Sequence, residues 1–114
     1  MNLTQAFFEV AAAYSGTVAI KFQTEEILYE HLVERIKNTA QVLQQEIKKG
    51  DIVFCLAENC PEIIELYLAT TAVGGIFVPL NTNLSVQEVA DILARTKPAF
   101  AYASTSLQST AEKA

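Results

Sequence analysis

The chain has 114 residues, a hydrophobic fraction of 51% and a net charge of −5, which together indicate a single domain with a well-filled core. Its eight lysine and arginine residues are scattered, so the sequence lacks the basic stripe of a nucleic-acid-binding surface. No apolar run approaches the roughly 18 to 20 residues of a membrane-spanning helix. Residues 1–14 contain no lysine or arginine, so we expect no signal peptide and a cytoplasmic location.

The sequence has two cysteines, Cys55 and Cys60, and one histidine, His31, which lies far from both. These residues are too few and too far apart for a metal site. Cys55 falls within an apolar run that is typical of a buried strand, so we expect no disulfide. Two isolated thiols fit a reducing compartment.

The first predicted element is a helix over residues 2–14. Asn2 can cap it, with the Gln5 side chain reaching back to the cap. Gly16 is expected to end it, because the position after a helix favours a residue that tolerates the left-handed conformation. A helix this short holds only by packing against other elements. We expect it to pack through four apolar residues at helical spacing, Leu3, Phe7, Val10 and Tyr14.

A β-hairpin is favoured for the next stretch. Residues 18–22 predict a strand, residues 23–26 a polar turn, and residues 27–29 the second arm of the hairpin. In the alternative, a helix begins directly at Thr24, and the two glutamates that follow occupy its first turn. The two interpretations differ in whether residues 27–29 are extended or helical.

The longest predicted helix covers residues 30–48. Lys48 and Lys49 would lie at its C-terminus, where cations complement the helix dipole, and Gly50 would end it. We interpret the lysine pair in this way rather than as a ligand-binding pair. The buried face should be a narrow stripe that advances by three or four residues, formed by Leu32, Ile36, Ala40, Leu43 and Ile47.

A buried strand and a buried helix form the centre of the chain. Residues 51–56 are almost continuously apolar, as expected of a strand covered on both faces. Pro61 suits the first helical position, and the helix that it begins, to about Val73, is apolar almost all round. Gly74 and Gly75 are interpreted as a helix stop and a point of close packing.

A second strand, over residues 76–78, is closed by Pro79, because proline cannot donate a hydrogen bond to a neighbouring strand. A polar loop follows. Ser85 and Glu88 then predict a capping box that opens a helix to about Arg95. Its buried side chains should be Val89, Ile92 and Leu93.

The Lys97–Pro98 pair ends this helix, and residues 99–103 predict a last parallel strand. Strands joined by helical crossovers imply a parallel, right-handed arrangement. We therefore predict an α/β fold, a parallel sheet that is mixed at the N-terminal hairpin and has flanking helices. Residues 1–104 should form one subdomain, and residues 105–114, rich in Ser, Thr and Ala, should be a frayed tail.

Ligands of parallel α/β sheets usually bind at the carboxyl ends of the strands, here residues 57–60, 79–83 and 104–106. None of these segments has the glycine pattern of a phosphate-binding loop. A nucleophile, a base and an oxyanion site are all missing. We therefore predict no catalytic residue and no metal ligand in this chain.

The individual candidates have simpler explanations. Cys60 occupies a helix N-cap position, where the pKa of a thiol can be lowered, but no base lies nearby and we interpret it as a substituted cap. His31 is interpreted as a surface residue of the long helix. Three glutamates precede or open a helix, where the dipole stabilises carboxylates without any acid–base role: Glu58, Glu62 and Glu65.

The central stretch resembles a known family. Five segments, in this order, are similar to the N-terminal part of the adenylate-forming ligases, the AMP-binding acyl-CoA synthetases: Gly50-Asp51 with its apolar strand, ENCPE at 58–62, the long apolar helix, GGIFVPLN at 74–81 and SVQE at 85–88. The resemblance covers about residues 1–104. Within the family, YLAT at 67–70, Gly74-Gly75 and PLNT at 79–82 most resemble malonyl-CoA synthetase-like members.

Three departures indicate a divergent member. Cys60 stands where the family usually has a serine cap, Leu28 where a threonine or serine opens the long helix, and Val73 where a lysine is common.

The resemblance implies a two-step reaction that serves fatty acid metabolism, in which a carboxylate attacks ATP to form an acyl-adenylate and a thiol, usually that of CoA, displaces AMP. ATP, magnesium and CoA are the implied cofactors. Family members are several times longer and place the phosphate loop, the magnesium-holding glutamate and the mobile lysine downstream of the matched region. The chain would therefore be an N-terminal scaffold fragment, not catalytic by itself.

The same resemblance places Asn81, Thr82 and Asn83 near the CoA nucleotide. The implied partner is the remainder of the ligase. The alternative is a stand-alone interaction module that pairs with itself or with another chain, because a high apolar fraction in a short chain can reserve surface for a partner.

Overall fold

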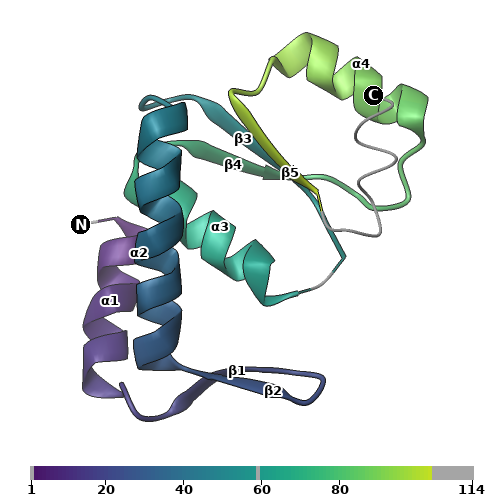
Figure 1. The fold of residues 1–114 in the computed structure, drawn as a ribbon. Helices are drawn as coiled ribbons and strands as arrows, with labels where there is room; N and C mark the ends of the chain where they lie inside the picture. The colour runs from purple at the N-terminus through teal and green to yellow at the C-terminus, as the bar shows by residue number, and fades with distance from the viewer. Residues whose placement is uncertain (1, 59, 104–114) are drawn as a thin grey trace.

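The computed structural model describes residues 2–58 and 60–103 (Figure 1). Their elements follow the order α1 (Leu3–Ala13), β1 (Val18–Phe22), β2 (Glu25–Leu28), α2 (Tyr29–Glu46), β3 (Ile52–Leu56), α3 (Pro61–Ala72), β4 (Ile76–Pro79), α4 (Val86–Thr96) and β5 (Phe100–Ala103). The predicted tail over residues 105–114 lies outside the described residues.

β3, β4 and β5 form a parallel sheet in the order β4-β3-β5. β1 and β2 pair antiparallel in a separate two-stranded sheet, so the hairpin does not join the parallel strands. The predicted α/β class, with a parallel sheet and flanking helices, is confirmed. The antiparallel pairing lies beside that sheet rather than within it.

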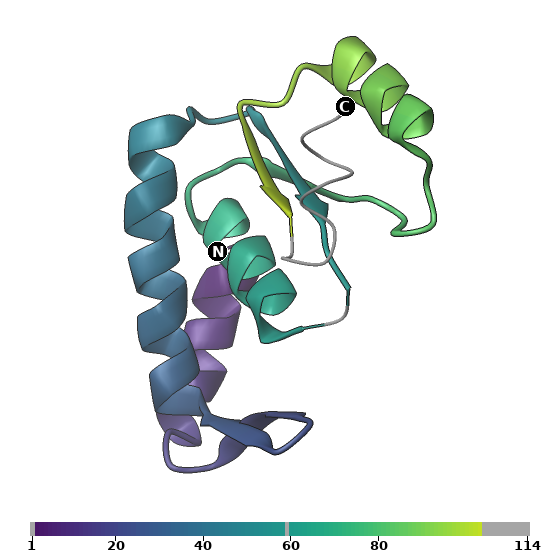
Figure 2. The ribbon, with the colours of Figure 1, turned by 45° about the vertical axis from the view of Figure 1, so that its right-hand side comes forward.

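The central strand, β3, is covered on both faces. Successive side chains of a strand point to opposite faces. Val53 and Cys55 belong to the main core, together with buried residues of α2 and α3. Phe54 and Leu56 line a small cavity of about 90 Å³ with residues of α4. Figure 2 shows α4 on the opposite side of the sheet from α2 and α3, and the prediction of a doubly covered strand is confirmed.

α1 begins with the predicted capping box. The Gln5 backbone N–H donates to Asn2 Oδ1 at 2.9 Å, and the Asn2 backbone N–H donates to Gln5 Oε1 at 3.1 Å. The expected stop at Gly16 is wrong, because the helix already ends at Ala13 and Gly16 does not have a positive φ. The chain turns instead through a hydrogen bond from the Thr17 backbone N–H to the Tyr14 carbonyl.

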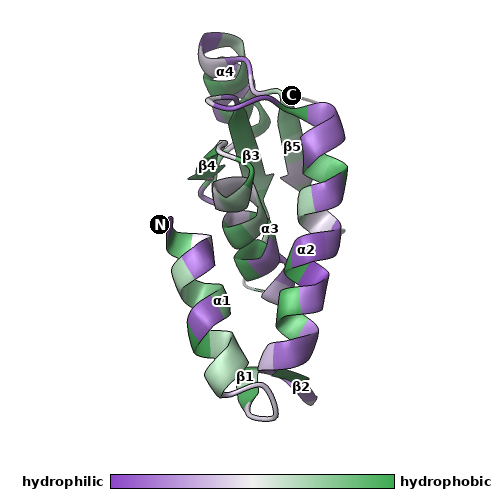
Figure 3. Cartoon of the chain, turned by 90° about the vertical axis from the view of Figure 1, so that its left-hand side faces the viewer, coloured by the Kyte–Doolittle hydropathy of each residue, from purple (hydrophilic) through white to green (hydrophobic). Residues whose placement is uncertain are grey.

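The buried face of α1 differs from the predicted one. Thr4 and Ala11 are buried, and the Thr4 hydroxyl donates to the Leu68 carbonyl of α3 at 2.5 Å. Small side chains on this face allow α1 to approach α3 closely. Of the four predicted residues, Phe7 is half-buried and packs against the core. The other three lie half exposed to solvent, Leu3 at 50%, Val10 at 51% and Tyr14 at 57%. In Figure 3, α1 accordingly carries more hydrophobic colour than α2.

The hairpin is confirmed, with a tighter turn than predicted. Gln23 adopts a φ of 55°, which lets the chain reverse over residues 23–24 alone. Phe22 therefore pairs with Glu25, and Ile20 pairs with Ile27, which is buried. The helical alternative for this stretch is wrong, because α2 begins only at Tyr29.

The predicted stripe of α2 is confirmed, with Ala40 half-buried and the others buried. The predicted end is wrong, because α2 stops at Glu46 and both lysines follow it in a turn. The Asp51 carboxylate accepts from the Lys48 backbone N–H at 2.8 Å, and the Asp51 N–H donates to the Lys48 carbonyl at 3.0 Å. Gly50 has a φ of 89° within this turn rather than at a helix end.

Both parts of the Gly74-Gly75 interpretation are confirmed. Gly74 follows α3 with a φ of 83°. A Cβ on Gly75 would lie 2.9 Å from Ile47 Cδ1 and 3.0 Å from Thr70 Cγ2, so both neighbours would have to shift to admit a side chain. The expected all-round burial of α3 is only partly correct: the Ile64 and Tyr67 side chains remain 40% and 45% exposed on one side.

α4 also begins as predicted, because Ser85 and Glu88 form a complete capping box. Of the three side chains expected to be buried, Val89 is fully buried, whereas Ile92 and Leu93 are half-buried. Lys97 adopts the left-handed conformation, with a φ of 49°, and turns the chain into Pro98 and β5.

Candidate functional site

The carboxyl ends of the parallel strands meet along one edge of the sheet, as predicted. Cys55 is in register with Pro79, and Leu56 with Ala103. The Leu80 backbone N–H donates to the Cys55 carbonyl at 2.8 Å and continues this pairing beyond β4. The segments after β3 and β4 therefore lie together, whereas residues 104–106, expected to join them, fall outside the described residues.

The loop over Asn81, Thr82 and Asn83 is a compact turn that its own first side chain stabilises. The Asn83 backbone N–H donates to Asn81 Oδ1 at 2.8 Å, and the Leu84 N–H donates to the Asn81 carbonyl at 3.2 Å. Asn81 and Asn83 are exposed, and Thr82 is half-buried. The turn thus presents side-chain amide and hydroxyl groups to solvent at the carboxyl edge, where they can donate to and accept from a polar ligand.

Cys60 caps α3, but its side chain makes no capping hydrogen bond. Burial and the Glu62 carboxylate raise the pKa of the Cys60 thiol and outweigh the nearby backbone N–H groups of the first turn, which lower it. A thiol with a raised pKa is protonated at neutral pH and a poor nucleophile. Cys60 therefore takes the predicted N-cap position, and the raised pKa favours a substituted cap over a reactive thiol.

Cys55 is a buried core residue, and both cysteines carry free thiols, as predicted. Burial is the largest cause that raises the pKa of the Cys55 thiol to about 11. Neither cysteine therefore offers a thiolate to this edge of the sheet.

An ion pair across α2 and α3 is the group that sequence reasoning missed. Arg35 Nε contacts Glu65 Oε1, and the Glu65 side chain is buried, with the whole residue 7% exposed. Burial raises the pKa of Glu65, while Arg35 lowers it and Glu62 raises it. The sequence explanation of Glu65 by the helix dipole alone is therefore incomplete. The helical spacing did signal that position 65 is buried, because it falls on the buried side of α3.

The remaining candidates are surface residues. His31 is exposed on α2, with Nε2 3.8 Å from a carboxylate oxygen of its neighbour Glu30. Glu58 is exposed just after β3. No three His, Cys, Asp or Glu side chains within residues 2–58 and 60–103 converge as a metal site requires.

The described helices include none that is both long enough and apolar enough to cross a membrane. The same residues also contain no glycine-rich loop that opens a helix, which is one common phosphate-binding arrangement.

A sequence model of the AMP-binding enzyme family matches residues 7–114, almost the whole chain. The chain belongs to the AMP-binding enzyme family. It is 35% identical over 98 residues to the crotonobetaine/carnitine–CoA ligase of Citrobacter koseri, and 34% identical to that of Salmonella paratyphi B. The match covers 81% of the chain but 19% of each relative, so the chain spans about a fifth of their length.

Solved structures place the chain in the N-terminal part of such ligases. The N-terminal subdomain of Klebsiella oxytoca NpsA matches with a TM-score of 0.82 and 28% identity over 90% of this chain and 26% of that one. Coronafacic acid ligase of Pectobacterium brasiliense, in a mutant form, matches with a TM-score of 0.92 and 29% identity over 99% of this chain and 23% of that one.

A benzoate CoA ligase of Burkholderia xenovorans shares the fold, with a TM-score of 0.95 at 18% identity over 99% of this chain and 23% of that one. In each structure the matched region is part of a longer ligase or subdomain. The predicted family and its N-terminal part are therefore confirmed. The finer resemblance to malonyl-CoA synthetase-like members stays a prediction.

Proposed function

We propose that this chain is the N-terminal scaffold of an ATP-dependent carboxylate–CoA ligase. In the proposed reaction a carboxylate oxygen attacks the α-phosphorus of ATP and pyrophosphate leaves; the CoA sulfur then attacks the acyl carbon, loses its proton and displaces AMP. The supporting observation is the family match over residues 7–114 together with 35% identity to a crotonobetaine/carnitine–CoA ligase. ATP, magnesium and CoA would bind to the whole ligase.

The scaffold role predicts that this chain alone does not bind ATP with magnesium. A ligand at 100 times its Kd stabilises a protein by about 2.7 kcal/mol, which moves the Tm of a small domain by several degrees. We expect no Tm shift for the 114-residue chain in ATP and magnesium. A reproducible shift would contradict the scaffold role, whatever the full ligase does.

The ligase activity itself is tested on the product of the complete reading frame. Carboxylate-dependent exchange of pyrophosphate into ATP reports the first step, and release of free CoA thiol reports the second. The acids should include crotonobetaine, malonate, benzoate and a fatty acid, since the malonyl-CoA-like prediction and a role in fatty acid metabolism are open. Failure of every acid in both assays would contradict the proposal.

We further propose that the turn formed by Asn81, Thr82 and Asn83 lies on the CoA nucleotide side. Support comes from its place at the carboxyl edge and its exposed polar side chains. Asn83→Ala keeps the turn, because the backbone N–H makes the bond to Asn81. Loss of one hydrogen bond should raise the KM for CoA about 3- to 10-fold and leave pyrophosphate exchange unchanged. Asn38→Ala, at an exposed position of α2, is the control. Equal KM values for CoA in the two variants would contradict this placement.

A second candidate is an interaction module that pairs with itself, as the half-exposed residues Leu3, Val10 and Tyr14 of α1 suggest. Light scattering of the 114-residue chain at micromolar concentration tests it, and a clean monomer would remove it. A cytoplasmic location also remains a proposal, which the two free thiols support.

A further inference from the structure

One guanidinium faces two carboxylates where α2 packs against α3. Arg35 Nε contacts Glu65 Oε1, and Arg35 Nη2 lies 3.8 Å from Glu62 Oε1. Because the two glutamates are three positions apart on α3, they are neighbours on one face of the helix. Their exposure differs, since the Glu65 side chain is 9% exposed and the Glu62 side chain 45%. Arg35 therefore has a buried partner and an exposed partner of the same chemistry within reach.

The buried carboxylate is only partly compensated by this contact. Within residues 2–58 and 60–103, Glu65 Oε1 is buried and accepts no hydrogen bond, although Arg35 Nε touches it as an ion-pair partner. An ionised carboxylate out of water is costly unless its oxygens are fully hydrogen-bonded, and such a group takes up a proton instead. Glu62 keeps its contact with solvent. The geometry therefore favours a proton on Glu65.

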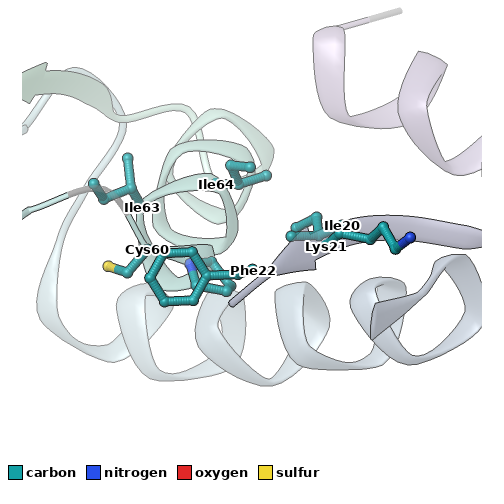
Figure 4. Close-up of a pocket in the computed structure, with 7 residues that line it drawn as sticks. Ile20, Lys21, Phe22, Cys60, Ile63 and Ile64 are labelled. Carbon is teal, nitrogen blue, oxygen red and sulfur yellow. The ribbon is translucent and has the colours of Figure 1, made fainter. Parts of the chain in front are cut away.

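The remaining neighbours add no positive charge. The hairpin faces the start of α3 across an apolar groove, which Phe22 of β1 and Cys60 at the helix start line together (Figure 4). Glu25 of β2 pairs with Phe22 and brings a further carboxylate to this side of α3. Tyr102 of β5 is neutral at neutral pH, because burial raises the pKa of its phenol above the ordinary value of 10. The buried face of α1 carries no charged side chain.

These surroundings set the direction in which the proton affinity of Glu65 changes. Burial raises the pKa of Glu65 above its ordinary value of 4.5, and Arg35 lowers it without reversing the shift. The like charges of Glu62 and Glu25 raise it further. A guanidinium keeps its charge in proteins at any such pH. When Glu65 becomes neutral, Arg35 therefore still needs a carboxylate partner.

We propose that Arg35 is a two-position switch: its guanidinium pairs with Glu65 while that carboxylate is charged and turns to Glu62 when Glu65 takes up a proton. A neutral carboxyl group can stay buried without a counter-charge. The movement is small, because Arg35 already lies 3.8 Å from Glu62. As the pH falls, the tie between α2 and α3 moves from a buried contact to an exposed one. This inference does not depend on the ligase function proposed above.

Carboxyl titration by NMR tests the switch in the 114-residue chain. The ¹³C shifts of the glutamate carboxyl groups and the ¹⁵N shift of Arg35 Nε are followed from pH 3 to pH 8. We expect the midpoint of Glu65 to lie above 4.5 and the Arg35 signal to change with that midpoint. A midpoint at or below 4.5, or an Arg35 signal that does not follow Glu65, would overturn the proposal.

Glu65→Gln mimics the protonated state at neutral pH and so holds the switch in one position. At pH 7 the Arg35 Nε signal of this variant should move in the direction in which protonation moves it in the wild type. Glu46→Gln, at an exposed position of α2, is the control and should leave the signal in place. An Arg35 signal in Glu65→Gln that stays at its wild-type value would contradict the switch.

The second position is tested by the unfolding equilibrium constant, measured in urea at pH 7. In the wild type, Glu62→Gln should change this constant by less than about 2-fold, because Arg35 is held by Glu65. In the Glu65→Gln background the same substitution should favour unfolding by about 3-fold or more. Adding Arg35→Met to that background should abolish the effect, and the combined variant should fold because it leaves no buried charge unpaired. An effect of Glu62→Gln that is equal in all three backgrounds would show that Arg35 does not change partner.

Discussion

α3 and α4 cover opposite faces of the same sheet and are held in different ways. α3 begins at Cys60 without a side-chain cap, yet Leu66, Leu68 and Ala69 are buried in the main core. α4 begins with a complete capping box, yet only Val89 is fully buried. Burial therefore stabilises α3, which lacks a side-chain cap, and a capping box helps to stabilise α4, which has little burial.

The largest difference between the two helices should appear when a leucine is truncated in each. Leu66 is buried in α3, whereas Leu93 is half-buried in α4 beside the small cavity. Leu66→Ala should cost about 2–5 kcal/mol of unfolding free energy, the range for fully buried leucines. Leu93→Ala should cost less than about 2 kcal/mol, because it removes less buried area. Urea unfolding of both variants measures this, and equal costs would mean that α4 is held by packing as firmly as α3.

The close packing at the end of α3 predicts a second, smaller effect. The Cβ in Gly75→Ala would meet Ile47 Cδ1 and Thr70 Cγ2 at 3.0 Å or less and the Asp51 carbonyl at 3.3 Å. Overpacking of this kind costs about 1–3 kcal/mol. Gly16→Ala is the matched control, since nothing lies within 4 Å of its added Cβ and its φ is not positive. A loss in urea unfolding that is the same for both glycines would refute the packing role.

The buried carboxylate of α3 predicts a pH effect on the stability of the protein. Burial raises the pKa of Glu65 above its ordinary value of 4.5, so the folded protein holds this proton more tightly than the unfolded chain does. The protonated Glu65 side chain contributes its full share of the unfolding free energy below pH 4.5, and this contribution is lost as the pH rises through the pKa of Glu65 in the folded protein.

Glu65→Gln removes this titration, so the wild type should lose stability relative to the variant as the pH rises from 4.5 to 7. Arg35→Met should steepen the loss, because Arg35 lowers the pKa of Glu65. Glu46→Gln, at an exposed position of α2, is the control. Urea unfolding across the pH range is the measurement, and parallel curves for wild type and Glu65→Gln would exclude a raised folded pKa.

The sequence predicts best those features that neighbouring residues determine. The Ser85–Glu88 box, the Pro61 start and the left-handed Gly74 are all local, and all are confirmed. The end of α2 was predicted too late. The Asp51 carboxylate accepts a hydrogen bond from the Lys48 N–H, which places Lys48 in a turn after Glu46.

Features that depend on distant residues were predicted poorly. The apolar spacing of α1 does not reveal which side docks, because its other face carries the small residues Thr4 and Ala11 that permit close approach to α3. The Arg35–Glu65 contact joins two helices 30 positions apart, which no local pattern encodes. At the candidate site, the sequence located the polar loop at 81–83 but not the side-chain bond that shapes its turn.

The smallest predicted effects concern the two helix caps. Ser85→Ala removes the bond from the Glu88 N–H to Ser85 Oγ, 3.1 Å long, and should cost about 1 kcal/mol. Cys60→Ser gives α3 the cap that it lacks and should add a few tenths to about 1 kcal/mol, since a hydroxyl accepts from a first-turn N–H more strongly than a thiol does. Urea unfolding measures both changes, provided that the dependence of the unfolding free energy on urea concentration is the same in each variant. If Cys60→Ser instead destabilises the chain, the apolar packing of the thiol contributes more than a side-chain cap would. Burial would then stabilise the start of α3 as well as its centre.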